Sequence, residues 1–105
     1  MVRFEPKVDE DDIQRLAASA KAFGDPTRLR IVKMLADSRY PLCVNAIAHQ
    51  LDVTQSAVSQ HLRVLRQAGA VTGRREGRRV HYAVNPRALR EHVRLFRQAL
   101  HLKKG

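Results

Sequence analysis

Five polar side chains on one face of the stretch from Thr54 to Gly69 have the hydrogen-bonding chemistry to read base pairs. Amide, hydroxyl and guanidinium groups can donate or accept hydrogen bonds at base edges. An apolar stripe at helical spacing, Val58, Leu62 and Leu65, lies opposite them. We expect one helix over 54–69 that either enters the major groove of DNA or lies on the surface with a polar outside. The polar residues are Gln55, Ser56, Ser59, Gln60 and Arg63.

A cluster of arginines follows this stretch. After Gly69 the apolar residues alternate, which predicts two strands in 71–84 joined by a hairpin with glycine at its turn. The tip of this predicted β-wing carries four basic side chains, which either contact phosphates or the minor groove, or form a solvated charged turn. Phosphate contacts supply affinity and register rather than sequence choice. The arginines are Arg74, Arg75, Arg78 and Arg79.

The charge of the whole chain also indicates a polyanionic partner. There are 20 Lys and Arg residues against 10 Asp and Glu, and the net charge is +10. A cationic surface of this strength indicates nucleic acid or an anionic membrane. No apolar run approaches the ~18 residues of a membrane span, and the N-terminus lacks the apolar core of a signal peptide. We therefore expect a cytoplasmic protein that does not bind membranes, and the lone Cys43 suits that reducing compartment.

Four further helices are predicted to position these groups within a single domain, 1–105. A flexible arm over 1–8 precedes a helix that opens with acidic residues at 9–12 and ends at Gly24. Asp25-Pro26 starts the second helix, Leu42–Leu51 forms the third, and a last helix runs over about 87–103. The third helix and 54–69, joined by a tight connector, make a helix-turn-helix. The expected fold is mostly α with a small β-hairpin, in the order ααααββα.

Four motifs give the chain a specific resemblance. They are F-G-D-P-T-R-L-R-I at 23–31, P-L-C-V at 41–44, T-Q-S-A-V-S-Q-H-L-R-V-L-R-Q-A-G at 54–69 and R-R-E-G-R-R-V-H-Y at 74–82. With these the chain resembles the ArsR/SmtB family of bacterial winged-helix repressors over roughly 13–85. The resemblance implies a homodimer formed by the first and last helices, bound to a promoter until an effector releases it.

Apolar stripes on the two terminal helices agree with that implied dimer. The alternative is that the last helix packs on the first within one subunit. Two-fold symmetry would place the two reading helices about one DNA turn apart, which predicts an inverted-repeat operator. The interface residues we expect are Ile13, Leu16, Ala20, Leu89, Val93, Phe96 and Leu100.

The metal-ligand patterns of the family are not matched. Its C-V-C pattern corresponds here to Cys43-Val44-Asn45, so the second thiolate is absent, and a single thiolate binds soft metals poorly. On the last helix, Arg90-Glu91-His92 and His101 depart from the D-x-H and H-x-x-H patterns. We predict no metal and no cofactor. Cys43 is either a thiol switch near a helix N-terminus or a small packing residue, and the effector stays open.

Three classes of function can be compared. A sequence-specific dimeric DNA-binding repressor is the leading hypothesis. The alternative is a non-specific, nucleoid-type basic protein that binds through charge alone, and the uncharged polar face at 55–60 argues against it. An enzyme is not expected, because we find no nucleophile–base pairing motif, metal-ligand set or phosphate-binding glycine loop.

Overall fold

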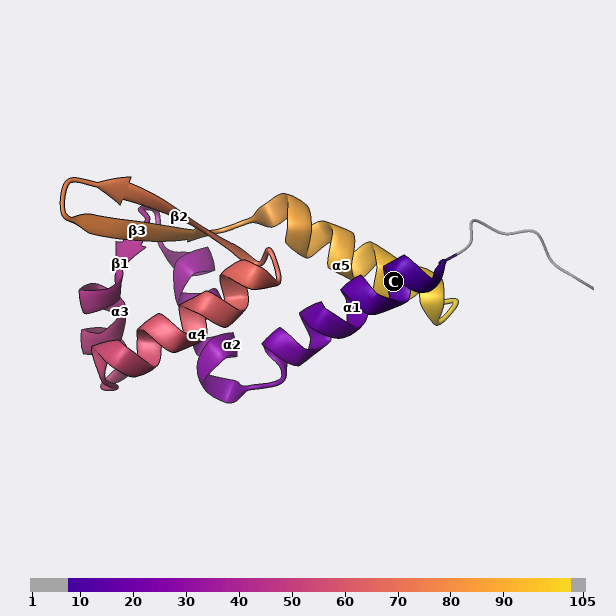
Figure 1. Cartoon of the computed structure of the whole chain (residues 1–105), viewed down its shortest axis with the longest axis horizontal. Coiled ribbons are helices and arrows are strands. Elements are labelled where there is room, and N and C mark those ends of the chain that lie inside the picture. The colour runs from indigo at the N-terminus through magenta and orange to yellow at the C-terminus, as the bar shows by residue number, and fades with distance from the viewer. Residues whose placement is uncertain (1–7, 103–105) are drawn as a thin grey trace, which may run out of the picture.

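The computed structural model describes residues 8–102, which form five helices and a three-stranded antiparallel sheet (Figure 1). Except for Val8, the predicted arm over 1–8 lies outside the described residues. None of the helices within 8–102 is long and apolar enough to cross a membrane. The elements are α1 Glu10–Phe23, α2 Pro26–Asp37, β1 Leu42–Cys43, α3 Val44–Leu51, α4 Gln55–Gln67, β2 Val71–Glu76, β3 Arg79–Val84 and α5 Pro86–Ala99.

Four helices begin at the polar residues that the sequence indicated. The side chains of Asp9, Asp25, Thr54 and Asn85 each accept a hydrogen bond from a backbone N–H of the first helical turn. These bonds satisfy donors that have no partner inside the helix. Proline follows the cap in α2 and α5, where its missing N–H costs nothing.

The third helix is shorter than predicted, because its first two residues form a strand. Leu42 pairs with Tyr82 and Cys43 pairs with His81, which makes β1 the outer neighbour of β3 in the sheet order β1-β3-β2. The order of elements is therefore ααβααββα rather than ααααββα. The prediction was wrong here because a two-residue strand carries no local period and is stabilised by pairing with residues about 40 positions away.

The β-wing turn is also tighter than predicted. Glu76 pairs with Arg79, so only Gly77 and Arg78 form the loop, and Gly77 has a φ of 64° that favours glycine. Arg74 and Arg75 therefore lie within β2 rather than at the tip, and as neighbours in a strand they point to opposite faces.

A continuous apolar core joins α2, α3, α4 and the sheet. Its centre consists of side chains that are at most 1% exposed, and the ring of Tyr82 lies over Gly73, where a Cβ atom would come within 3.0 Å of the ring. This core fixes the position of α4 on the body of the domain. The five most buried large side chains are Ile31, Ile47, Leu62, Leu65 and Val58.

The paired helices α1 and α5 extend away from this body (Figure 1). Leu95, 3% exposed, is the buried residue of α5, and the sequence reading missed it. His92 contacts Phe23 edge to face, with ring centroids 5.5 Å apart. Within one subunit, α5 therefore does pack on α1. It does so through a different face from the predicted seam.

Most of the predicted seam remains exposed. Val93, Phe96 and Leu100 are 45%, 44% and 54% exposed, and Ile13 on α1 is 41% exposed, whereas Leu89 packs against the core. The last helix ends at Ala99, earlier than the predicted residue 103.

Candidate nucleic-acid interface

Both ends of α4 are fixed by local hydrogen bonds. The hydroxyl of Thr54 accepts from the backbone N–H of Ala57 at 3.0 Å. At the other end, the N–H groups of Gly69 and Ala70 donate to the carbonyls of Arg66 and Leu65, both at 2.9 Å. Gly69 adopts the left-handed conformation, with φ 78°, that this helix-ending motif requires. The predicted helix is confirmed, and its boundaries follow from its caps.

Burial separates the two faces of α4 as the sequence predicted. Val58, Leu62 and Leu65 are at most 1% exposed, and they anchor the helix to the core. Because the helix cannot rotate without exposing these residues, its other face is fixed toward solvent. All five predicted reading residues are exposed: Gln55, Ser56, Ser59, Gln60 and Arg63.

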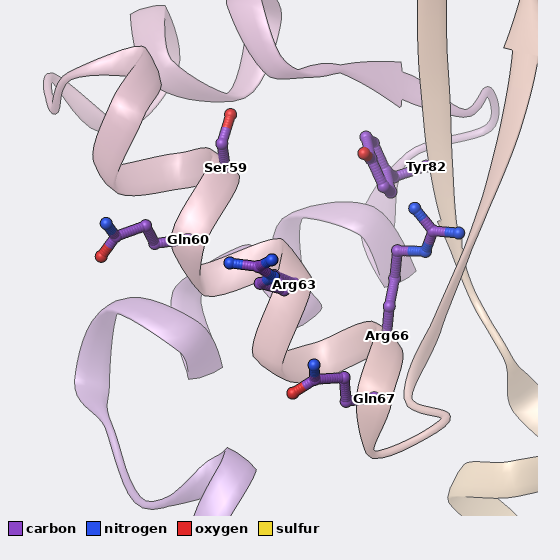
Figure 2. Close-up of a pocket in the computed structure, with 6 residues that line it drawn as sticks. All are labelled: Ser59, Gln60, Arg63, Arg66, Gln67 and Tyr82. Carbon is purple, nitrogen blue, oxygen red and sulfur yellow. The ribbon is translucent and has the colours of Figure 1, made fainter.

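The C-terminal half of this face continues into a groove beside the sheet (Figure 2). Ser59, Gln60 and Arg63 line it together with three residues that the sequence reading missed, Arg66, Gln67 and Tyr82. The side chain of Arg66 extends along the groove toward Tyr82 in Figure 2. Arg66 and Gln67 follow Arg63 at three- and four-residue spacing, which could have revealed them. Tyr82 comes from β3, and only the tertiary fold brings it here.

A hydrogen bond joins the start of α4 to α3. Nε2 of Gln55 donates to Oδ1 of Asn45 at 2.5 Å. Asn45 therefore holds Gln55, one of the predicted reading residues. The sequence had drawn attention to Asn45 only because it stands where the family pattern has a second cysteine.

The arginines of the wing have different surroundings, although all four are exposed. Arg78 lies in the turn, and Arg75 shares its face of the sheet with Val80 and Tyr82. Arg74 lies opposite His81 on the other face. Nη1 of Arg79 on β3 donates to Sγ of Cys43 on the neighbouring strand β1, at 3.8 Å.

Cys43 is the N-cap residue of α3 and is half-buried. The backbone N–H of Ala46, and then the guanidinium of Arg79, favour the thiolate and lower the pKa of Cys43 below its ordinary value. Among residues 8–102, no three His, Cys, Asp or Glu side chains are grouped so that they could hold a metal ion.

Two other polar residues serve the fold. Nε of Arg28 donates to the carbonyl of Ala22 at 2.6 Å, and its Nη1 lies 3.3 Å from Nδ1 of His61. Arg28 thus ties the end of α1 to α4. His92 stacks on Phe96 as well as contacting Phe23, and burial lowers the pKa of His92. These contacts make His92 a packing residue of the helix pair.

Comparisons with known proteins agree with this arrangement. The sequence pattern described as "Bacterial regulatory protein, arsR family" matches residues 25–72. The uncharacterized HTH-type transcriptional regulator MJ1325 of Methanocaldococcus jannaschii is 39% identical over 82 residues, which are 78% of this chain and 91% of that protein. A transcriptional repressor SmtB homolog of Synechocystis sp. is 43% identical over 74 residues, 70% of this chain and 54% of that protein.

A solved structure extends the likeness to the whole fold. The homodimeric winged helix-turn-helix DNA-binding domain Mb0332 from Mycobacterium bovis, described as a possible ArsR-family regulator, covers 94% of this chain and 90% of its own. The TM-score is 0.72 and the sequence identity is 26%. DNA binding and homodimers are typical of this family, whose members are transcription regulators rather than enzymes. From its sequence motifs, its winged helix-turn-helix and these relatives, the chain belongs to the ArsR/SmtB family of DNA-binding transcriptional regulators.

Proposed function

We propose that the chain is a homodimeric repressor that binds an inverted-repeat operator through two copies of α4. The observation that carries this proposal is the exposed, largely uncharged face of α4, held outward by its buried stripe. Amides and hydroxyls in that position can discriminate between base pairs in the major groove, whereas lysines and arginines alone would supply only affinity.

The exposed apolar residues of α1 and α5 support the dimer. Ile13, Val93, Phe96 and Leu100 present large side chains to solvent on the helix pair that projects from the body. Apolar surface of this kind in a small domain indicates a protein contact. A two-fold axis at this pair would use the same surface from both subunits, with Leu16 and Ala20 at its edge.

The proposed contacts fall into two groups. Gln55, Ser56, Ser59 and Gln60 read base edges, and Gln suits the paired donor and acceptor of adenine. Arg63 meets a phosphate or a guanine one helical turn further on. The wing supplies phosphate contacts through Arg75 and Arg78, with Arg74 and Arg79 adding to its positive field.

Comparing operator with shuffled DNA tests this proposal against charge-only binding. The chain's own promoter fragment and a shuffled duplex of the same length are titrated at matched salt. A specific repressor binds the promoter at least about 1,000-fold more tightly. Equal affinity for the two duplexes would favour the nucleoid-type alternative.

For the effector, we propose thiol oxidation at Cys43 rather than metal binding. The lowered pKa of Cys43 and its contact with Arg79 support a reactive thiol that is coupled to the wing. Attack of the thiolate on hydrogen peroxide forms an S–O bond, breaks the O–O bond and releases hydroxide, which leaves a sulfenic acid. The added oxygen would displace Arg79, which lies next to the turn, and shift the tip of the wing.

Peroxide treatment of the protein bound to its operator tests this switch. We expect the oxidant to weaken operator binding by the wild-type protein and to leave Cys43→Ser unaffected, and a reductant should restore the wild type. An equal response of the two proteins to peroxide would contradict a role for Cys43.

A further inference from the structure

Asn45 lies beside the proposed reading face without belonging to it. It is the second residue of α3, is exposed, and accepts the hydrogen bond from Nε2 of Gln55, the first residue of α4. Building on the proposed reading role of Gln55, we propose that Asn45 is a positioning residue that decides which edge of the Gln55 carboxamide faces a base pair.

A count of hydrogen-bonding atoms supports this role. The carboxamide of Gln55 has two N–H donors and one oxygen acceptor. An adenine in the major groove takes one donor and one acceptor from glutamine. The bond to Asn45 uses one N–H, which leaves one N–H donor and the oxygen of the Gln55 carboxamide, the number of groups that adenine needs. Reversing the Gln55 amide alone would bring its oxygen against the Asn45 oxygen, and two acceptors repel each other, so a reversal also requires the Asn45 carboxamide to turn.

The backbones that carry the two residues are fixed. Ile47 and Ala48 on α3 are 0% and 5% exposed and share one core with the buried stripe of α4. Asp52 closes α3 in the left-handed conformation, two residues before the Thr54 cap of α4. Gln55 is otherwise a long side chain with several rotamers, so an anchor on a rigid neighbour reduces the entropy lost when it binds a base.

This role predicts an effect on specificity and not on general affinity. Without Asn45, Gln55 would still reach DNA but would sample other rotamers. We expect Asn45→Ala to reduce discrimination about fivefold at one base pair, within the range of a single bidentate contact. Affinity for random duplexes and the melting temperature should stay unchanged, because Asn45 is exposed and lies outside the core.

The test is a double-mutant cycle on a duplex that the wild-type protein selects from a random library. Discrimination is measured for the wild type, Asn45→Ala, Gln55→Ala and the double variant at each base pair of a half-site. We expect the two single variants to relax selection at the same base pair. In the Gln55→Ala background, Asn45→Ala should then change discrimination less than about twofold.

Asn45→Asp is the matched control, because its carboxylate keeps an acceptor for Gln55 and suits the first turn of a helix. It should retain the base preference while its negative charge weakens binding to every duplex alike. A positioning role is overturned if Asn45→Ala has no effect, acts at another base pair, or acts equally in both backgrounds. If Gln55→Ala itself leaves selection unchanged, the reading face is wrongly assigned and this proposal is overturned with it.

Discussion

Two adjacent arginines in β2 provide a matched pair for testing how the wing contacts DNA. Arg75 lies on the face of the sheet that carries Tyr82, which lines the groove beside α4. Arg74 lies on the opposite face with His81. We therefore expect Arg75→Ala to remove one phosphate contact in each subunit, and Arg74→Ala to leave the phosphate contacts unchanged.

The size of the effect follows from counterion release. Each phosphate contact contributes about 0.9 to the slope of log affinity against log salt, so losing one per subunit lowers the slope of a dimer by about 1.8. If the variant and the wild type bind equally at about 1 M salt, this change in slope makes the variant bind about 30-fold more weakly at roughly 0.15 M salt. That ratio corresponds to about 2 kcal/mol of binding free energy.

Fluorescence anisotropy with a labelled operator duplex, repeated over roughly 0.05 to 0.4 M salt, measures both slopes. Arg75→Ala should show the shallower slope, and Arg74→Ala should match the wild type. Equal slopes for the two variants, or a larger loss for Arg74→Ala, would refute the assignment of the two faces.

Three other perturbations test the scaffold. Arg28→Ala should lower the free energy of unfolding by about 2 kcal/mol, because it removes a charged donor from a backbone carbonyl; exposed Arg30→Ala is the control in urea denaturation, and similar losses for the two variants would count against this role. Val93→Asp and Phe96→Asp should each convert the proposed dimer to monomer in sedimentation equilibrium, because each places a charge on the exposed apolar surface. A dimer that persists in both variants would contradict an interface at these residues. Because burial lowers the pKa of His92 in the folded state, the unfolded state binds more protons below about pH 6.5, and stability should fall as pH falls through that window. His92→Gln should weaken this dependence in urea titrations, and an unchanged pH profile would argue against half-buried His92 as its source.

The sequence predicted the elements whose signals are local. Caps at Thr54 and Asn85, the buried stripe through Leu62 and the glycine at 69 all act within a few residues, so their positions were readable before the fold was known. The polar face of α4 followed directly, because burial of one side of a helix determines which residues remain on the other.

Features that depend on distant pairing were not predicted. Strand β1 exists because Leu42 pairs with Tyr82, and nothing in the sequence near residue 42 indicates that partner. The burial of Leu95 follows from how α5 packs on α1, which a repeating apolar pattern alone did not reveal. The bond from Gln55 to Asn45 likewise depends on the angle between two helices.

Selection from a randomised duplex library tests the central claim most directly, because the operator sequence need not be known in advance. If α4 reads bases from both subunits of a dimer, the enriched sequences should contain an inverted repeat. Its half-sites should be centred about one helical turn, or roughly 10 base pairs, apart. A library that shows no enriched sequence, or a single half-site with no symmetric partner, would contradict the account.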